Sequence, residues 1–177
     1  MKGKYYIKVR NRRTEITVHV QRRVSVIKGN SGTGKSTFIS FVQQYLENGR
    51  SSGIHCDTNA QNLLVLRQDL DYESKINSLL GTNTIVLADE GISYLESNEF
   101  ERVLSGSGFY LIVVSRDVLK CFDYSVYDVF EFKSIKRGSL TYTYQEMLYT
   151  EDNRVSFPKL LVTEDSTSGE RVLTVLS

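Results

Sequence analysis

The chain has 177 residues and a net charge of +1, with 40% apolar and 24% charged residues. This length suits one domain with a sizeable core, and the composition is that of an ordinary soluble globular protein. No apolar run approaches the length of a membrane span, and the two cysteines, Cys56 and Cys121, lack the spacing of a zinc site or a disulfide framework. We therefore expect a single domain over residues 1–177, located in the reducing cytoplasm.

Residues 1–28 combine strand patterns with an excess of positive charge. The segments YYIKV and EITVHV alternate apolar and polar residues, which predicts two strands joined by a turn at NRRT. The same segment holds nine Lys or Arg and a single acid, Glu15. The simpler interpretation of this charge is a solvated hairpin face. The alternative is a surface that binds nucleic acid or an acidic partner.

A glycine-rich loop follows the third apolar run. Residues 28–37 read KGNSGTGKST and match the pattern G-x-x-x-x-G-K-[ST] at Gly29, Gly34, Lys35 and Ser36. RRVSVI before the loop predicts a strand, and the apolar spacing of STFISFVQQYL after it predicts a helix. In that context backbone N–H groups and the helix N-terminus bind phosphate. We expect Lys35 to contact the β- and γ-phosphates and Ser36 to ligate magnesium.

The next segment gives weaker signals. RSSGIHCDT predicts a short strand near Ile54, and residues 60–80 are predicted to form one or two helical pieces. The adjacent His55, Cys56 and Asp57 suggest catalysis or metal binding, but neighbouring residues of a strand point to opposite faces. We therefore favour a structural role for these three residues.

An apolar run that ends in two acids supplies the second part of the expected site. TIVLADE predicts a buried parallel strand that ends at Asp89 and Glu90. A phosphate-bound Mg²⁺ needs a carboxylate at the end of a neighbouring strand, which Asp89 provides. Glu90 is then the general base for the attacking water, which favours hydrolysis over transfer to a small molecule. The alternative is a strand that ends in two surface acids.

A further buried strand, FYLIVV, is followed by Ser115 and Arg116. A polar residue at this tip can hydrogen-bond the γ-phosphate or the attacking water, and Ser115 is placed for such a contact. Arg116 either stabilises charge in the transition state or pairs with Asp117 or Asp89. The sequence leaves these two interpretations of Arg116 open.

The remaining chain predicts an antiparallel ribbon and a tail. Alternation on both sides of the turn KRGS covers residues 127–149, and Arg137 in that turn is isolated in the sequence. Residues 159–170, KLLVTEDSTSGE, are similar to the opening of a Toprim nuclease domain. A closing edge strand and turn is the simpler interpretation of this tail.

On these motifs the chain resembles the P-loop NTPases and, within them, the ABC-type ATPases. GNSGTGKST is similar to that branch's G-x-S-G-x-G-K-S-T, and an apolar strand ending in Asp-Glu follows it. The resemblance implies a three-layer α/β P-loop NTPase fold, with a mostly parallel sheet and an added antiparallel region of N-terminal and C-terminal strands. It divides the chain into a basic β region (1–28), a nucleotide-binding core (29–132) and C-terminal strands with a tail (133–177).

The resemblance also implies roles for single residues. It implies magnesium ligation by Ser36 and Asp89 and a water-activating role for Glu90. Together with the inferences from the motifs above, the expected catalytic residues are Glu90, Lys35 and Arg116. The expected nucleotide contacts are Gly29, Asn30, Ser31, Gly32, Thr33, Gly34, Lys35, Ser36, Thr37 and, at the neighbouring strand tip, Ser115.

The chain departs from the ABC-type pattern in three places. No L-S-G-G-Q signature precedes TIVLADE, and LSGSG at 104–108 follows that strand, where it is expected to end a helix. Arg116 stands where the family has its switch histidine, and only Gln61 and Gln68 are candidates for its glutamine loop. These departures leave the family's head-to-tail dimer and transport coupling open, and indicate a minimal ABC-like or AAA-like ATPase core.

The expected function is therefore that of a Mg²⁺-dependent ATPase that acts on a macromolecular partner. That partner is a protein, a second copy of the chain, or nucleic acid bound through the basic hairpin. ATP is favoured over GTP because the sequence contains no N-K-x-D motif. One alternative is a small-molecule or nucleotide kinase, although no Arg-rich lid lies between Asp89 and Phe109. Another is a nucleotide-gated sensor or adaptor with little hydrolysis.

Overall fold

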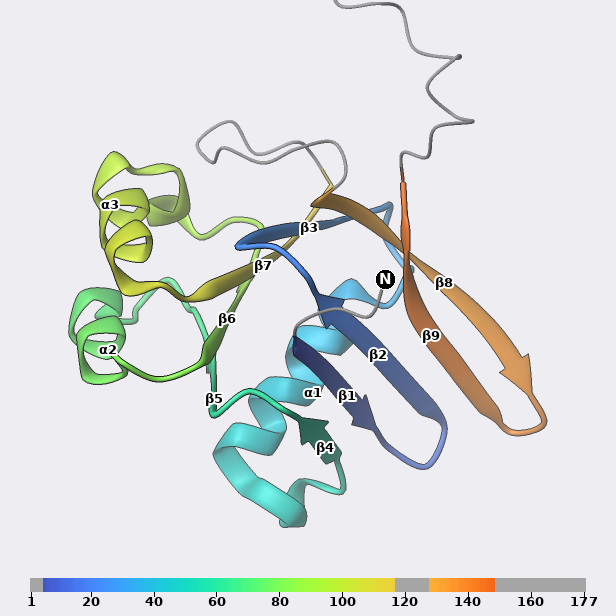
Figure 1. The fold of residues 1–177 in the computed structure, drawn as a ribbon. Helices are drawn as coiled ribbons and strands as arrows, with labels where there is room; N and C mark the ends of the chain where they lie inside the picture. Colours follow the sequence, from blue (N-terminus) through green and yellow to red (C-terminus); the bar gives the residue numbers. More distant parts are fainter. Residues whose placement is uncertain (1–4, 117–127, 149–177) are drawn as a thin grey trace, which may run out of the picture.

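A computed structural model describes residues 5–116 and 128–148 of the chain (Figure 1). Nine strands form one sheet in the order β4-β1-β2-β9-β8-β3-β7-β6-β5. The strands are β1 (Tyr5–Arg10), β2 (Thr14–Val20), β3 (Val24–Lys28), β4 (His55–Thr58), β5 (Asn62–Val65), β6 (Thr84–Asp89), β7 (Tyr110–Ser115), β8 (Val129–Arg137) and β9 (Leu140–Met147). The helices are α1 (Lys35–Asn48), α2 (Tyr72–Ser78) and α3 (Asn98–Ser107), with two short 3₁₀ turns, η1 (Gly49–Ser52) and η2 (Ser93–Glu96).

The expected three-layer α/β P-loop NTPase fold is wrong. The sheet is mixed and curls into a half-barrel, and strands account for 41% of the described residues against 30% for helices. The physical reason lies in β1 and β2, whose apolar residues alternate with polar ones. Such strands bury one face only, so they need a helix on one side and leave the other side uncovered. In the described part of the chain, helices therefore do not form complete layers on both sides of this sheet.

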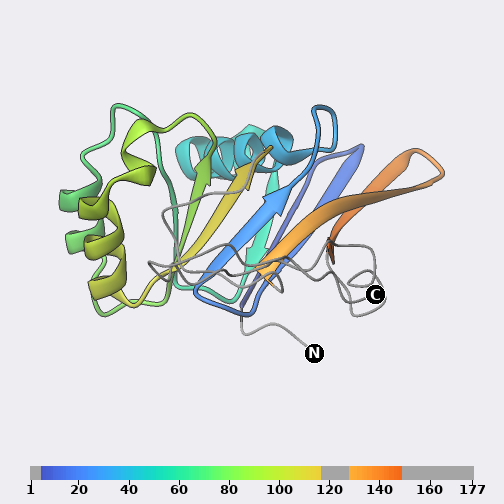
Figure 2. The same ribbon diagram turned by 90° about the horizontal axis from the view of Figure 1, so that it is seen from above.

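Among the described residues, the parallel region of the sheet is buried on both faces. Strands β3, β7, β6 and β5 pair in parallel, and their side chains alternate between two apolar clusters. Helix α1 packs with Ile85, Leu87 and Ile112 in one cluster, whereas α2 and α3 pack with Val86 and Leu111 in the other. Figure 2 shows α1 lying along one side of the sheet and α2 and α3 gathered at its β5–β6 end. This doubly buried region positions the candidate site.

Several expected elements are confirmed. The N-terminal hairpin pairs with Tyr5 opposite Val20, and the ribbon β8–β9 pairs with Arg137 opposite Leu140. The expected strand, glycine loop and helix of the phosphate motif are present as β3, residues 29–34 and α1.

The helical expectation for residues 60–80 is partly wrong, because NLLV forms β5 beside β6 and only α2 is an α-helix there. A short apolar run next to a buried strand has no periodicity that separates helix from strand. Among the described residues, no helix is long and apolar enough to cross a lipid bilayer. Asp117, Cys121 and the tail 159–170 lie outside the described residues.

Candidate functional site

The glycine loop joins the end of β3 to the start of α1. Gly32 and Gly34 have φ of +88° and +97°, a left-handed conformation that side chains with a Cβ rarely adopt. A Cβ on Gly29 would lie 3.2 Å from Thr33 Oγ1, so a larger residue there would crowd the loop. Helix α1 begins after Gly34 without a side-chain cap and without an acid in its first turn. Its first N–H groups and its dipole are therefore available to an anion.

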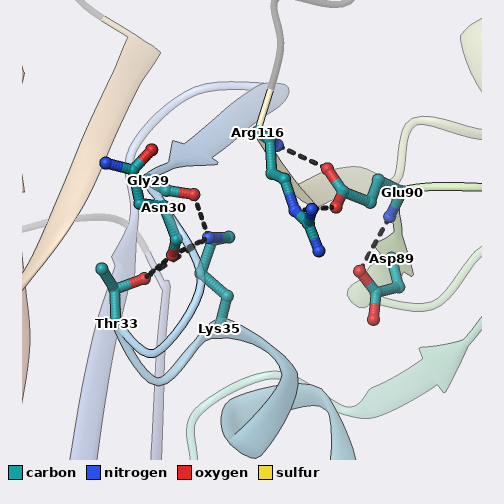
Figure 3. A network of polar contacts seen from close by, with 7 residues as sticks. All are labelled: Gly29, Asn30, Thr33, Lys35, Asp89, Glu90 and Arg116. Carbon is teal, nitrogen blue, oxygen red and sulfur yellow. Dashed lines mark hydrogen bonds and ion pairs between the residues drawn. The ribbon is translucent and has the colours of Figure 1, made fainter.

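Lys35 is the buried cation of this loop. Its ammonium donates hydrogen bonds to the carbonyl oxygens of Gly29 and, at 2.9 Å, Asn30, and it lies 3.4 Å from Thr33 Oγ1 (Figure 3). Burial lowers the pKa of Lys35, while the nearby Glu90 carboxylate acts in the opposite direction. The lysine thus lies folded back into the loop, held only by oxygens that an incoming phosphate can replace.

The parallel pairing of β3, β7 and β6 brings two further segments to the loop. Because parallel strands end at the same edge of a sheet, the acids at the end of β6 and the arginine after β7 meet the loop there. Asp89 Oδ1 accepts a hydrogen bond from the N–H of Glu90 at 2.8 Å, and that N–H also donates to Val114 O at 3.0 Å. Burial raises the pKa of Asp89 above its ordinary value of 3.8. Asp89 is therefore half-buried, and a cation beside it would stabilise the charged form of its carboxyl group.

Glu90 and Arg116 form an ion pair across the end of the two strands. Arg116 Nε lies 2.9 Å from Glu90 Oε1, and the Arg116 backbone N–H donates to Glu90 Oε2. The sequence suggested Asp89 as one possible ion-pair partner of Arg116, whereas the structure pairs Arg116 with Glu90. Figure 3 shows the guanidinium directed at Glu90, with Lys35 on the other side of the gap.

A pocket of about 280 Å³ lies between these groups. It is lined by Ser31, Gly32, Thr33, Gly34, Lys35, Ser36, Thr37, Asp89, Glu90 and Arg116. Three expected nucleotide contacts do not line it. Gly29 and Asn30 instead hold Lys35 through their carbonyl oxygens, and Ser115 is buried in β7 opposite Lys28.

The donor set fits a hard cation only with help from a ligand. Ser36 and Asp89 both line the pocket and offer one hydroxyl and one carboxylate. In residues 5–116 and 128–148, no group of three or more His, Cys, Asp or Glu is arranged to hold a metal by itself. Mg²⁺ keeps several waters and takes substrate phosphate oxygens as ligands, so these two residues suit a Mg²⁺–phosphate complex.

The weaker candidates of the sequence do not reach the pocket. Gln61 accepts a hydrogen bond from the N–H of Asn83 at 2.7 Å, and Gln68 is bonded to Ser93 at 2.7 and 2.8 Å. Cys56 faces the interior on β4, and burial raises its pKa to about 11, which keeps the thiol protonated. These residues therefore have structural roles.

Strand β9 also reaches the loop, which no motif in the sequence predicted. A Cβ on Gly34 would lie 3.9 Å from Thr143 Cγ2, and the Thr143 hydroxyl is 2.8 Å from Ser134 Oγ. Thr143 is buried on the inward face of β9, so the ribbon packs against the start of α1. In the sequence, only the alternation of residues along β9 indicates that the Thr143 side chain faces inward.

Comparison with known proteins adds nothing to this geometry, since no family model, no curated protein and no solved structure matches the chain.

Proposed function

We propose that the protein binds ATP with Mg²⁺ in this pocket and hydrolyses it. One observation carries the proposal. Three segments far apart in the sequence bring a buried lysine, an uncapped helix N-terminus, a serine hydroxyl, two carboxylates and an arginine to one pocket. This combination of groups is suited to a polyphosphate and its metal ion. The resemblance of KGNSGTGKST and TIVLADE to the motifs of P-loop ATPases supports the same assignment.

Lys35 and the loop N–H groups bind the phosphates. The Lys35 ammonium exchanges the carbonyl oxygens of Gly29 and Asn30 for phosphate oxygens, and the negative phosphates stabilise the charged form, which burial disfavours. Ser36 and Asp89 hold the metal ion, which neutralises charge on the phosphates. The Asp89 carboxylate, half-buried without a bound cation, is stabilised in its charged form by this contact.

Glu90 orients the attacking water and accepts its proton. Its carboxylate lies next to Asp89 at the pocket and is fixed by the Arg116 backbone N–H, so it stays in place when the guanidinium moves. The Arg116 side chain is 65% exposed, which leaves it free to move from Glu90 to the γ-phosphate. There its charge stabilises the transition state.

The test is the release of phosphate from ATP by the wild type and by Glu90→Gln. The wild type hydrolyses ATP in the presence of Mg²⁺, and Glu90→Gln keeps its affinity for ATP but loses about 10²- to 10⁴-fold in rate. Glu96→Gln is the matched control, because Glu96 is an exposed acid of η2 that does not line the pocket. It retains the wild-type rate.

Two results would replace the proposal. Transfer of the γ-phosphate to an acceptor at an undiminished rate in Glu90→Gln would indicate a kinase. Binding of ATP with equally low phosphate release in the wild type and Glu90→Gln would indicate a sensor or adaptor. We further propose that hydrolysis acts on a partner protein or on a second copy of the chain. The measurement for this part is stimulation of phosphate release by that partner.

A further inference from the structure

The turns of the two hairpins lie side by side at one end of the sheet (Figure 1). The N–H of Thr141 donates to Arg13 O at 2.8 Å, and β2 pairs in parallel with β9 from Thr14 and Thr141 onward. On the other side, Arg10 of β1 pairs with His55 of β4. This arrangement joins basic residues that the sequence holds more than a hundred positions apart. The basic end, as we call it, consists of Arg10, Arg12, Arg13, Lys136 and Arg137.

The five side chains of the basic end are exposed, and none of them forms an ion pair within the described residues. Three other basic residues of the N-terminal region already have partners. Lys8 pairs with Glu15 at 2.9 Å, and Arg22 pairs with Asp128 at 3.0 Å. Arg23 donates to the carbonyl oxygens of Leu104 and Ser105. Among the described residues, the basic end therefore gathers five exposed basic side chains without an ion-pair partner, and Arg137, isolated in the sequence, is one of them.

The backbone at the basic end is held independently of the basic side chains. Asn11 Oδ1 accepts hydrogen bonds from the N–H groups of Arg13 and Thr14, both at 2.8 Å. A surface pocket of about 410 Å³ opens beside this turn, lined by Arg10, Asn11, Arg12, Gly53, His55 and Leu140. It shares no residue with the nucleotide pocket. The basic end is thus separate from the pocket at the glycine loop, and hydrogen bonds to Asn11 hold the backbone of its N-terminal turn.

Aromatic side chains lead away from the basic end along β9. Tyr142 and Tyr144 alternate with the buried Thr143, so both lie on the outward face of the ribbon. The Arg137 guanidinium lies 5.8 Å from the centre of the Tyr142 ring, and Tyr144 is 39% exposed. A single-stranded nucleic acid presents phosphates on one side and bases on the other. Arginine side chains bind phosphate oxygens, and exposed tyrosine rings on β9 can stack with bases.

We propose that the basic end, with Tyr142 and Tyr144, binds single-stranded nucleic acid. Charge complementarity selects a polyanion, and the two tyrosines select one with bases to stack. An anionic membrane would take up several exposed apolar side chains, whereas close to the two turns Leu140 is half-buried and Ile135, opposite Tyr142, is 44% exposed. A membrane therefore fits less well than a nucleic acid strand. Binding at the basic end does not depend on ATP hydrolysis, so it is tested without nucleotide.

The experiment measures binding of fluorescein-labelled oligothymidylate and oligouridylate by anisotropy over a range of salt. With about 0.7 counterions released per phosphate contact, five contacts predict a log–log salt slope of about −3.5, or a roughly 100-fold loss between about 50 and 200 mM NaCl. Arg12→Ala/Arg13→Ala and Lys136→Ala/Arg137→Ala each weaken binding about tenfold or more at low salt and reduce the slope to about −2. The control Lys75→Ala/Arg102→Ala removes two exposed charges from α2 and α3 and leaves the slope unchanged.

The stacking contact has its own signature. Tyr144→Ala weakens binding about tenfold with no change in the salt slope, whereas Tyr144→Phe keeps the ring and the affinity. The two oligonucleotides separate DNA from RNA as the natural strand. No binding of either, or double variants that bind with the wild-type affinity and slope, would overturn the proposal. Binding to phosphatidylserine vesicles in place of both oligonucleotides would overturn it in favour of a membrane surface.

Discussion

Arg116 holds both carboxylate oxygens of Glu90. Its Nε lies 2.9 Å from Oε1, and its backbone N–H donates to Oε2. The two contacts differ in kind, because the backbone contact is fixed by the position of the residue directly after β7 and the guanidinium is free to leave. In the mechanism that we propose, Glu90 therefore keeps its orientation while the arginine charge moves to the phosphate.

Replacing Arg116 separates these two contributions. Arg116→Ala keeps the backbone contact to Glu90 and removes the charge, so kcat falls about 100-fold while ATP affinity changes little. Arg116→Lys recovers part of the rate, since it restores charge without the planar Nε contact. Steady-state phosphate release gives both constants. A faster Arg116→Ala enzyme would mean that the ion pair restrains Glu90 and has no role in the transition state.

Asp89→Asn tests the magnesium ligand. Asparagine retains an oxygen that can accept the hydrogen bond from the Glu90 N–H, so the local structure is preserved. The neutral amide is a much weaker ligand for Mg²⁺, and we expect the gain in ATP affinity caused by Mg²⁺ to fall about tenfold or more. Fluorescent ATP titrations with and without Mg²⁺ measure this ratio. An unchanged ratio would place the metal elsewhere.

The pH dependence of ATP binding follows from two shifted groups. Burial lowers the pKa of Lys35 below its ordinary value of 10.5. As the pH rises toward this lowered pKa, the ammonium loses its proton and ATP affinity falls. Burial raises the pKa of Asp89, so protons compete with Mg²⁺ as pH falls through a value above the ordinary 3.8. Protonation of ATP itself affects wild type and Asp89→Asn equally. The loss of ATP affinity at low pH that is due to Asp89 should therefore be absent from Asp89→Asn. The same loss at low pH in both proteins would contradict the role of Asp89.

The packing of α1 on the curled sheet makes a prediction about stability. Phe38 of α1 is fully buried, and its ring centre lies 5.9 Å from that of Phe132 on β8. Phe38→Ala should lower the free energy of unfolding by about 3 to 5 kcal/mol, because it leaves a cavity in this cluster. Leu46→Ala, on the exposed side of the same helix, should change it by less than about 0.5 kcal/mol. Equal effects in urea unfolding would show that α1 does not pack as described.

Local pattern was enough to predict the elements around the site. The strand before the glycine loop, the helix after it and the buried strand ending at Asp89 follow from periodicity and turn chemistry, and all three are present. Neighbouring parallel strands then bring Lys35, Asp89 and Glu90 to one edge. The contact of Arg116 with Glu90 was not predicted, because the choice between nearby acids depends on side-chain geometry.

Sheet order could not be predicted in the same way. The pairing of β2 with β9 joins residues 14–17 to 141–144, and nothing in either local pattern names the other strand. The resemblance of two motifs led to a prediction of a layered fold, whereas the sheet is curled, and its half-polar strands β1 and β2 bury one face only. The same long-range pairing creates the basic end, which is visible only once Arg13 and Thr141 are seen to be neighbours.

The most direct test of the account is equilibrium binding of ATP to the wild type and to Lys35→Ala. The wild type should bind ATP, and should bind it more tightly with Mg²⁺ than without. Lys35→Ala should bind about 10- to 100-fold more weakly, because a buried charged contact to phosphate is lost. If the wild type does not bind ATP, or if Lys35→Ala binds it with the same affinity, the pocket between the loop and Asp89 is not a nucleotide site.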